Sequence, residues 1–133
     1  MRFAKILIVD DEACVCEVAS RILRLAGYTT LTASDGPDAL LAVELNGPVD
    51  LLVTDLIMPL MLGDELARQL RRRLPRLRVL YLTGHSQLLF GTAPVLSDHE
   101  AFLDKPFTSE GLLEAVSFLL FGHGRGCDCP FLQ

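Results

Sequence analysis

Two apolar segments of this chain run directly into carboxylates, and this pattern constrains the fold more than any other feature. Residues 51–54 lead into Asp55, and residues 5–9 lead into Asp10 and Asp11. Short apolar runs of this kind are typical of strands that are buried on both faces of a parallel sheet. Because ligands bind such sheets outside the carboxyl ends of the strands, we expect these carboxylates to converge at one edge. An acidic turn that caps a helix would explain Asp10 or Asp11 alone, but not acids at the ends of two strands.

The rest of the chain alternates between strand and helix patterns. This alternation predicts an α/β fold with right-handed crossovers and a three-layer sandwich. Residues 28–33 are rich in β-formers but more polar than the other segments, so we expect an edge strand there. Further strands are expected at 79–83 and 101–103. Helices are expected at 12–26, 37–46, 63–74 and 109–121, together with a short, broken or mobile helix at 86–90.

Helical spacing of apolar residues predicts which helix faces are buried. The predicted core positions are Val15, Val18, Ala19, Ile22 and Ala26 in the first helix, Leu40, Leu41, Val43 and Leu45 in the second, and Leu112, Ala115, Val116 and Leu119 in the last. The last helix then keeps three apolar residues for its outer face: Leu113, Leu120 and Phe121. Exposed apolar clusters mark partner sites, so a homodimer or kinase-domain contact is expected there. The alternative is that a long helix simply lies deep under the tail.

Length and composition limit the class of protein. The 133 residues are half hydrophobic and carry a net charge of −5, which suits one globular domain and disfavours nucleic-acid binding. We expect a domain at 1–121 followed by a flexible, Gly-rich tail at 122–133. The sequence contains no signal-peptide core and no stretch long enough to span a membrane, so a cytoplasmic location is expected. The basic run 71–73 fits a solvated helix end better than a docking patch.

The cysteines form two close pairs in the sequence. Cys14 and Cys16 lie two positions apart on a predicted helix, so their side chains point in opposite directions and cannot bind one ion. We expect both thiols to be buried or unreactive. Cys127 and Cys129 lie in the tail, where a redox or metal role is open but nothing supports it.

The carboxylates at the predicted sheet edge suit a hard dication. Mg²⁺ takes oxygen ligands and relieves the repulsion that would otherwise raise their pKa values. Thr83 offers a hydroxyl, Gly84 a backbone N–H and Lys105 a mobile ammonium, which together resemble a clamp for a phosphoryl group. Aspartate is an accepted phosphoryl nucleophile. No Gly-x-Gly-x-x-Gly motif or P-loop follows any predicted strand, which disfavours dinucleotide and nucleoside-triphosphate binding.

Five motifs occur in order with consistent gaps. They are Asp10-Asp11, Asp55 with Met58-Pro59, Gly63, Leu82-Thr83-Gly84 and Lys105-Pro106-Phe107. Over residues 4–121 the chain resembles the receiver domain of bacterial two-component response regulators. Residues 82–86 and 102–107 resemble those of receivers attached to hybrid histidine kinases. The resemblance implies a flavodoxin-like (βα)5 fold with a parallel five-stranded sheet in the order 2-1-3-4-5.

The resemblance also implies roles for individual residues. Asp55 would be the phosphoacceptor in a His-Asp phosphorelay, receiving the phosphoryl group from a histidine kinase or phosphotransfer protein. Mg²⁺ would be held directly by Asp11, Asp55 and the Ile57 carbonyl, and by Asp10 through water. Lys105 and Gly84 would bind the phosphoryl oxygens, and the bond to Pro106 would be cis. Thr83 and Phe102 would act as the switch that passes the change to the face of the fourth helix, fifth strand and last helix.

In that scheme the chain is a signalling receiver that catalyses its own phosphotransfer and slow dephosphorylation, rather than an enzyme. Decay should be slow because Ile57 cannot orient water, unless His85 does so instead. Two features depart from the resemblance: residues 60–62 are unusually apolar, and the fourth helix is poorly specified. The chain would be either a stand-alone receiver or one excised from a hybrid kinase. The alternatives are an Mg²⁺-dependent phosphohydrolase with an aspartyl-phosphate intermediate, and an interaction module that has lost phosphorylation.

Overall fold

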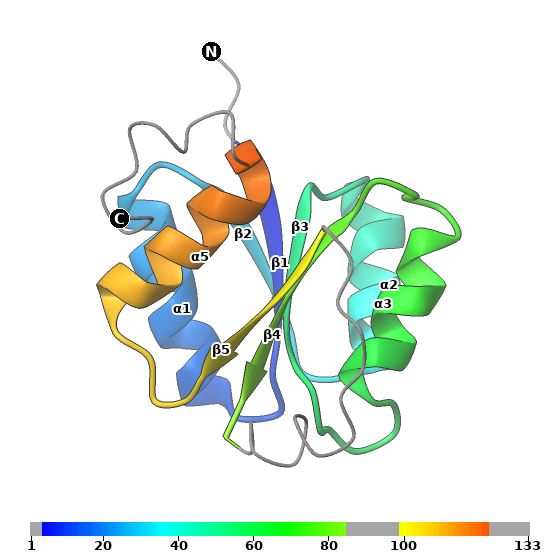
Figure 1. Cartoon of the computed structure of the whole chain (residues 1–133). Helices are drawn as coiled ribbons and strands as arrows, with labels where there is room; N and C mark the ends of the chain where they lie inside the picture. Colours follow the sequence, from blue (N-terminus) through cyan, green and yellow to red (C-terminus); the bar gives the residue numbers. More distant parts are fainter. Residues whose placement is uncertain (1–3, 85–98, 123–133) are drawn as a thin grey trace.

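The computed structural model describes residues 4–84 and 99–122. It contains one parallel sheet in the order β2-β1-β3-β4-β5, which confirms the predicted topology. Helices α1 and α5 cover one face, and α2 and α3 cover the other (Figure 1). The elements are β1 (Lys5–Val9), α1 (Ala13–Leu25), β2 (Thr29–Ala33), α2 (Gly36–Asn46), β3 (Leu51–Asp55), α3 (Gly63–Arg71), β4 (Arg78–Thr83), β5 (Glu100–Asp104) and α5 (Ser109–Phe121).

The expected fourth helix at 86–90 and nearly all of the expected tail lie outside the described residues. Strand β2 is the edge strand that its polar sequence predicted. In the described part of the chain, no helix is long and apolar enough to cross a membrane.

The register of the sheet brings the carboxyl ends of the central strands to one edge. Val9 in β1 pairs with Thr54 in β3, and Asp55 pairs with Leu82 in β4. All five residues of β3 are buried, as expected for a strand covered on both faces. Side chains alternate between the faces, so Leu52 packs under α2 and α3 while Val53 packs under α1 and α5. Asp10 and Asp55 therefore emerge side by side.

The buried face of α1 differs from the predicted one. Cys16, Ala19, Ser20 and Leu23 face the core, whereas Val18 and Ala26 are exposed. Ser20 can be buried because its hydroxyl lies 2.7 Å from that of Thr30 in β2, which satisfies both groups. The apolar residues on the opposite flank of this face, Val15 and Ile22, are only partly buried. The helix is thus rotated relative to the stripe that spacing alone indicated.

Helix α2 shows a second correction. Pro37 lies in its first turn, as predicted, and Asp35 caps the helix by accepting a hydrogen bond from the Asp38 N–H at 2.8 Å. Of its predicted core residues, Val43 is buried and Leu40 is partly buried, but Leu41 and Leu45 are exposed. Gly36 and Ala39 are buried in their place. Apolar residues surround most of this helix, so their spacing does not identify the face that packs on the sheet.

The last helix follows the prediction in part. The Thr108 hydroxyl accepts a hydrogen bond from the Gly111 N–H at 2.9 Å and so caps the start of the helix. Three of the four predicted core residues, Leu112, Val116 and Leu119, are buried. Leu113 and Leu120 are not on an outer face, because both pack partly buried against the core between α1, α5 and the sheet. The expected apolar contact surface is therefore reduced to Phe121, which is exposed. Helix α3 ends at Arg71, three residues before the predicted end.

Candidate functional site

The structure brings the three predicted carboxylates together at the carboxyl edge of the sheet. Asp10 and Asp55 are 1% and 9% exposed, while Asp11 is an exposed residue. One oxygen from each of these side chains lies within 4.8 Å of the others. Asp10 follows β1 and Asp55 ends β3, and the two strands are adjacent. Repulsion between neighbouring carboxylates makes this cluster costly unless cations neutralise it.

Lys105 is the cation of this site. Its Nζ lies 3.0 Å from Asp10 Oδ2 and 3.6 Å from Asp55 Oδ1. The backbone of Lys105 is fixed by a hydrogen bond from its N–H to the Thr83 carbonyl at 2.8 Å, and the peptide bond to Pro106 is cis. The side chain therefore reaches from the end of β5 across to the acids on β1 and β3.

Sequence reasoning missed Glu12. Its carboxylate lies 3.6 Å from Lys105 Nζ, and its backbone N–H donates to Asp10 Oδ1 at 2.9 Å. The available signal was that Glu12 continues the acidic run begun by Asp10 and Asp11. This exposed acid adds negative charge to the outer side of the site.

The charged groups of the site, together with burial, shift one another's pKa values. Burial is the largest cause that raises the pKa of Asp10, against hydrogen bonds from Glu12 and Lys105 that lower it. Burial, followed by repulsion from Asp10, raises the pKa of Asp55. Burial by itself lowers the pKa of Lys105, but the bond to Asp10 and the charges of Asp55 and Glu12 outweigh it and raise the value. The Lys105 side chain is therefore positively charged at neutral pH. Keeping the two buried acids ionised, by contrast, costs folding free energy.

The donor set fits a hard divalent cation. Carboxylate oxygens are the ligands that Mg²⁺ prefers, and the three acids are close enough to share one ion. Lys105 alone supplies one positive charge against these acids, so the cluster retains negative charge that a dication would balance. The side chain of Ile57 is exposed, and the proposed metal contact of its carbonyl stays a prediction.

The loop from Asp55 to α3 is held by its backbone. The Gly63 N–H donates to the Leu56 carbonyl at 2.8 Å, and Thr54 donates its hydroxyl to the Asp55 carbonyl at 2.9 Å. Leu60 has a φ of 73°, a left-handed conformation that is uncommon for a residue with a side chain. Three apolar residues of the loop, Ile57, Leu60 and Leu62, are exposed, whereas Met58 is buried in the core.

The two residues that were predicted to switch lie on adjacent strands. Thr83 is buried at the end of β4, and Gly84 follows it at the surface. Phe102 in β5 is partly buried against Tyr81, with ring centroids 5.5 Å apart and an angle of 44° between the rings. The Tyr81 hydroxyl donates to Glu100 at 3.4 Å, and burial and then this carboxylate raise the pKa of Tyr81. Phe102 thus packs on the α2 and α3 side of the sheet, against a second aromatic ring.

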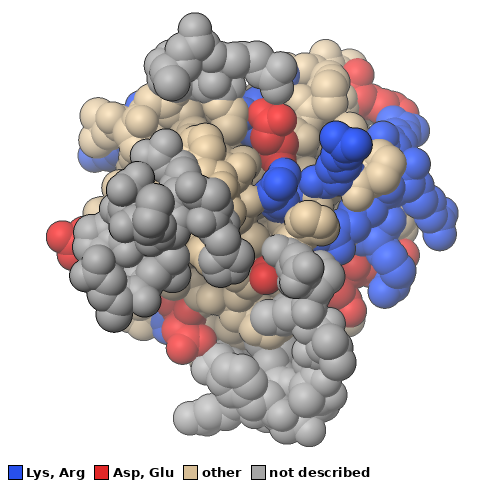
Figure 2. All heavy atoms as spheres, turned by 45° about the horizontal axis from the view of Figure 1, so that its top comes forward, with Lys and Arg blue, Asp and Glu red and all other residues tan. Residues whose placement is uncertain are grey.

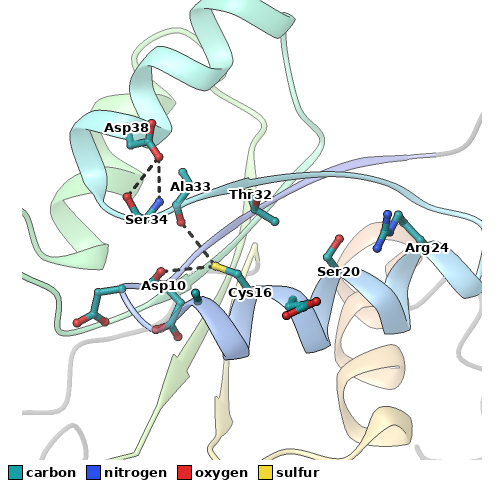
Figure 3. Close-up of a pocket in the computed structure, with 11 residues that line it drawn as sticks. Asp10, Cys16, Ser20, Arg24, Thr32, Ala33, Ser34 and Asp38 are labelled. Atoms are coloured by element: carbon teal, nitrogen blue, oxygen red, sulfur yellow. Dashed lines mark hydrogen bonds between the residues drawn. The ribbon is translucent and has the colours of Figure 1, made fainter.

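A cavity of about 510 Å³ opens beside the acids, between α1, the end of β2 and the start of α2 (Figure 3). Cys16 forms part of its wall, and its Sγ lies 3.5 Å and 3.6 Å from the carbonyls of Asp10 and Ala33 (Figure 3). Burial, then the charge of Asp10, raises the pKa of Cys16 to about 11. Cys14 is exposed, so the two thiols point in different directions, as predicted.

Known proteins have sequences related to this chain. The chain matches the response regulator receiver domain family over residues 6–117. It is 35% identical to part of the sensor kinase CckA of Brucella abortus (strain 2308), over 88% of this chain and 12% of that protein. It is 38% identical to the response regulator MprA of Mycobacterium ulcerans (strain Agy99), over 87% of this chain and 50% of that protein. The chain thus spans half or less of these relatives.

Solved structures agree with the sequence matches. The crystal structure of the receiver domain of the hybrid histidine kinase CckA is similar with a TM-score of 0.74 and 37% identity, covering 87% of this chain and 98% of that one. A structure of the chemotaxis response regulator CheY4 of Vibrio cholerae also gives 0.74, at 32% identity over 90% of this chain and all of that one.

Proposed function

This chain belongs to the response regulator receiver domain family, and we propose that it is a phosphorylation-dependent switch in which Asp55 is the phosphoacceptor. The phosphoryl donor would be the phosphohistidine of a histidine kinase or of a phosphotransfer protein. In the transfer, a carboxylate oxygen of Asp55 forms a bond to phosphorus while the bond from phosphorus to the histidine nitrogen breaks. Aspartate is suited to this role.

One observation carries the proposal: Lys105 Nζ lies within ion-pair distance of both Asp10 and Asp55 at the edge where the three acids meet. An incoming phosphoryl group adds negative charge at Asp55, and a fixed cation beside it stabilises that charge. Lys105 is held mainly by Asp10, so it remains in position when Asp55 becomes modified. Its raised pKa keeps the ammonium charged throughout the physiological range.

Mg²⁺ bound to Asp10, Asp11 and Asp55 would supply further charge neutralisation for the acids and the phosphoryl oxygens. Asp11 contributes an accessible carboxylate on the solvent side, whereas Asp10 contributes a buried one. The Ile57 carbonyl is the fourth protein ligand in this proposal. Gly84, with no side chain, leaves room for phosphoryl oxygens to approach its backbone N–H, since a Cβ added there would meet nothing within 4 Å.

The response would pass from Asp55 to Thr83 and Phe102. Thr83 lies beside Asp104 in the strand register, one residue before Lys105, so a movement of its hydroxyl toward the phosphoryl group is local. Phe102 lies three residues before Lys105. It would leave its position against Tyr81 and move into the space that Thr83 vacates. This change would alter the exposed surface of β5 and its neighbours.

Incubation with acetyl phosphate and Mg²⁺, followed by intact mass measurement, tests the function. We expect one phosphoryl group on the parent chain, none on Asp55→Asn, and an undiminished gain on Asp64→Asn, which removes an exposed acid on α3. Omitting Mg²⁺ should reduce the gain. Steady release of phosphate without accumulation of the modified chain would favour the phosphohydrolase alternative, and absence of any modification would favour an interaction module.

A phosphotransfer assay tests the partner. A purified histidine kinase domain carrying phosphohistidine should lose its phosphoryl group to this chain but not to Asp55→Asn. The similarity to a hybrid-kinase receiver makes such a kinase a suitable first donor. Transfer from acetyl phosphate but from no phosphohistidine protein would contradict the proposed relay.

A further inference from the structure

A second surface lies on the α2 and α3 side of the sheet and shares no residue with the acidic site. The two helices border a groove of about 480 Å³. Its lining is apolar and mainly basic, with one acid: Pro37, Leu40, Leu41, Glu44, Gln69, Arg72 and Arg73. Because α3 begins next to Asp55 and runs away from it, the basic end of the groove lies toward the opposite edge of the sheet (Figure 1).

The apolar part of this surface comes from leucines of α2 that are not buried in the core. Leu41 is 50% exposed and Leu45 is 75% exposed, on consecutive turns of α2. The space between α2 and the sheet is already filled by the small residues Ala39 and Val43. Single exposed leucines are ordinary, but two on one helix beside a groove form an apolar strip.

The basic part is concentrated in a short stretch of sequence. Six of the ten arginines lie between residues 68 and 78, in a chain whose net charge is −5. Figure 2 shows basic side chains gathered on one side of the molecule, with acidic ones more scattered. Arg71 forms an ion pair with Glu100 at 2.7 Å, and Arg73 forms one with Glu44 at 3.2 Å. Within the described residues, Arg72 and Arg76 have no ion pair.

The dipole of α3 explains part of this charge. A cation at the C-terminal end of a helix is stabilised by the last carbonyls, which accounts for Arg72. It does not account for Arg76, which lies five residues beyond the end of α3, or for the exposed leucines beside the groove. The combination indicates a surface that pairs an apolar strip with unpaired positive charge.

We propose that this groove binds an amphipathic helix of a partner protein. Its apolar residues would sit on Leu40 and Leu41, which line the groove, and extend over the exposed Leu45 one turn further along α2, while its carboxylates would face Arg72 in the lining and the exposed Arg76. A groove between two helices accepts a third helix, whose contact residues recur at i, i+3, i+4 and i+7. Charge complementarity requires that helix to be acidic. A helix can place its carboxylates opposite the arginines and keep them away from Glu44, whereas a polyanion such as nucleic acid or a lipid surface would carry negative charge along the whole groove and meet Glu44 as well.

The test is a titration of isotope-labelled protein with a helix-stabilised peptide that carries Leu at i, i+4 and i+7 and Glu at the flanking positions, followed by amide chemical shifts. We expect shifts along α2 and the end of α3. Leu41→Ser and Arg72→Glu should each weaken binding about tenfold, or roughly 1.4 kcal/mol. The matched controls Val18→Ser and Arg21→Glu, on the exposed side of α1, should leave the affinity unchanged.

Several results would overturn the proposal. Binding of equal strength by a peptide with Lys in place of Glu would remove the charge argument, and shifts centred on α5 or the acidic site would move the surface elsewhere. If the same amides shift with protein concentration alone, the occupant is a second copy of this chain. Equal or tighter binding of duplex DNA or anionic vesicles would replace the helical partner by a polyanion.

Discussion

The carbonyl oxygen of Asp55 lies so close to Gly63 that a side chain at position 63 would have no room. A Cβ built on Gly63 would be 2.3 Å from this oxygen, and the contact is with backbone, which cannot rotate away. Gly63 is also the first residue of α3, so this contact sets how closely the helix approaches the end of β3. The position of the phosphoacceptor candidate thus depends on a glycine eight residues later.

Gly63→Ala should therefore destabilise the fold, by about 1–3 kcal/mol, because the loop must move to admit the methyl group. Urea unfolding measures the change, and acetyl phosphate labelling should slow because Asp55 is displaced. Gly84→Ala serves as the control for stability alone, since its Cβ would meet nothing within 4 Å. Equal stability of both variants would mean that α3 shifts without resistance.

Asp10→Asn and Asp55→Asn should each stabilise the protein in the absence of Mg²⁺. The pKa of both acids is raised on folding, mainly by burial, so the native state binds more protons than the unfolded state and the ionised acids oppose folding. Their destabilising effect is fully present above the folded pKa values. It declines as pH falls through them, and vanishes below the ordinary value of 3.8. Unfolding by urea at neutral and acidic pH tests this sign, and a larger advantage of the variants at acidic pH would contradict it.

With Mg²⁺ present, the parent should become more stable than Asp10→Asn and Asp55→Asn. A ligand that binds only the folded state stabilises it by an amount that rises with the logarithm of its concentration over its dissociation constant, so Mg²⁺ should raise the melting temperature of the parent. Asp11→Ala removes an exposed carboxylate without leaving a buried gap, so its fold should persist while its response to Mg²⁺ is lost. Glu17→Ala is the control, as an exposed acid on α1. An Asp11→Ala chain that Mg²⁺ stabilises as fully as the parent would rule out this ligand.

Alkylation should distinguish the two cysteines of α1. Cys14 is exposed, whereas Cys16 is buried and its pKa is raised to about 11, so little thiolate forms at pH 8. Iodoacetamide followed by peptide mapping should modify Cys14 in the native protein and Cys16 only after unfolding. Rapid modification of Cys16 would show that the cavity beside β2 opens far more than its geometry indicates.

Ile57→Asn should shorten the lifetime of the phosphorylated state. The residue two positions after Asp55 has an exposed side chain, and an amide there can orient water where isoleucine cannot. One positioning hydrogen bond corresponds to about two- to tenfold in rate. Dephosphorylation after removal of the phosphodonor measures it, with His85→Ala as the comparison, at a position outside the described residues. An unchanged or slower decay in Ile57→Asn would mean that water access is controlled elsewhere.

Much of this protein could be predicted from local sequence. The fold class and strand order agree with the prediction, and the ends of β1 and β3 bring Asp10 and Asp55 together because parallel strands share one carboxyl edge. The first turn of α2 at Pro37 and the start of α5 after Thr108 also followed from sequence, since a helix start depends on neighbours in the chain.

Other features depended on tertiary contacts. Ser20 is buried and Val18 exposed because the hydroxyl of Thr30, ten residues away, satisfies the serine. Glu12 joins the site through the reach of Lys105 across the sheet, and Leu113 and Leu120 are covered by the packing of α5 against α1. Periodicity fixes which residues share a helix face, but the rotation of that helix against the sheet is set by the side chains it meets there. For that reason the sequence by itself determined the order of the elements and the acids at their ends, while only the folded chain decided which faces remain free for partners.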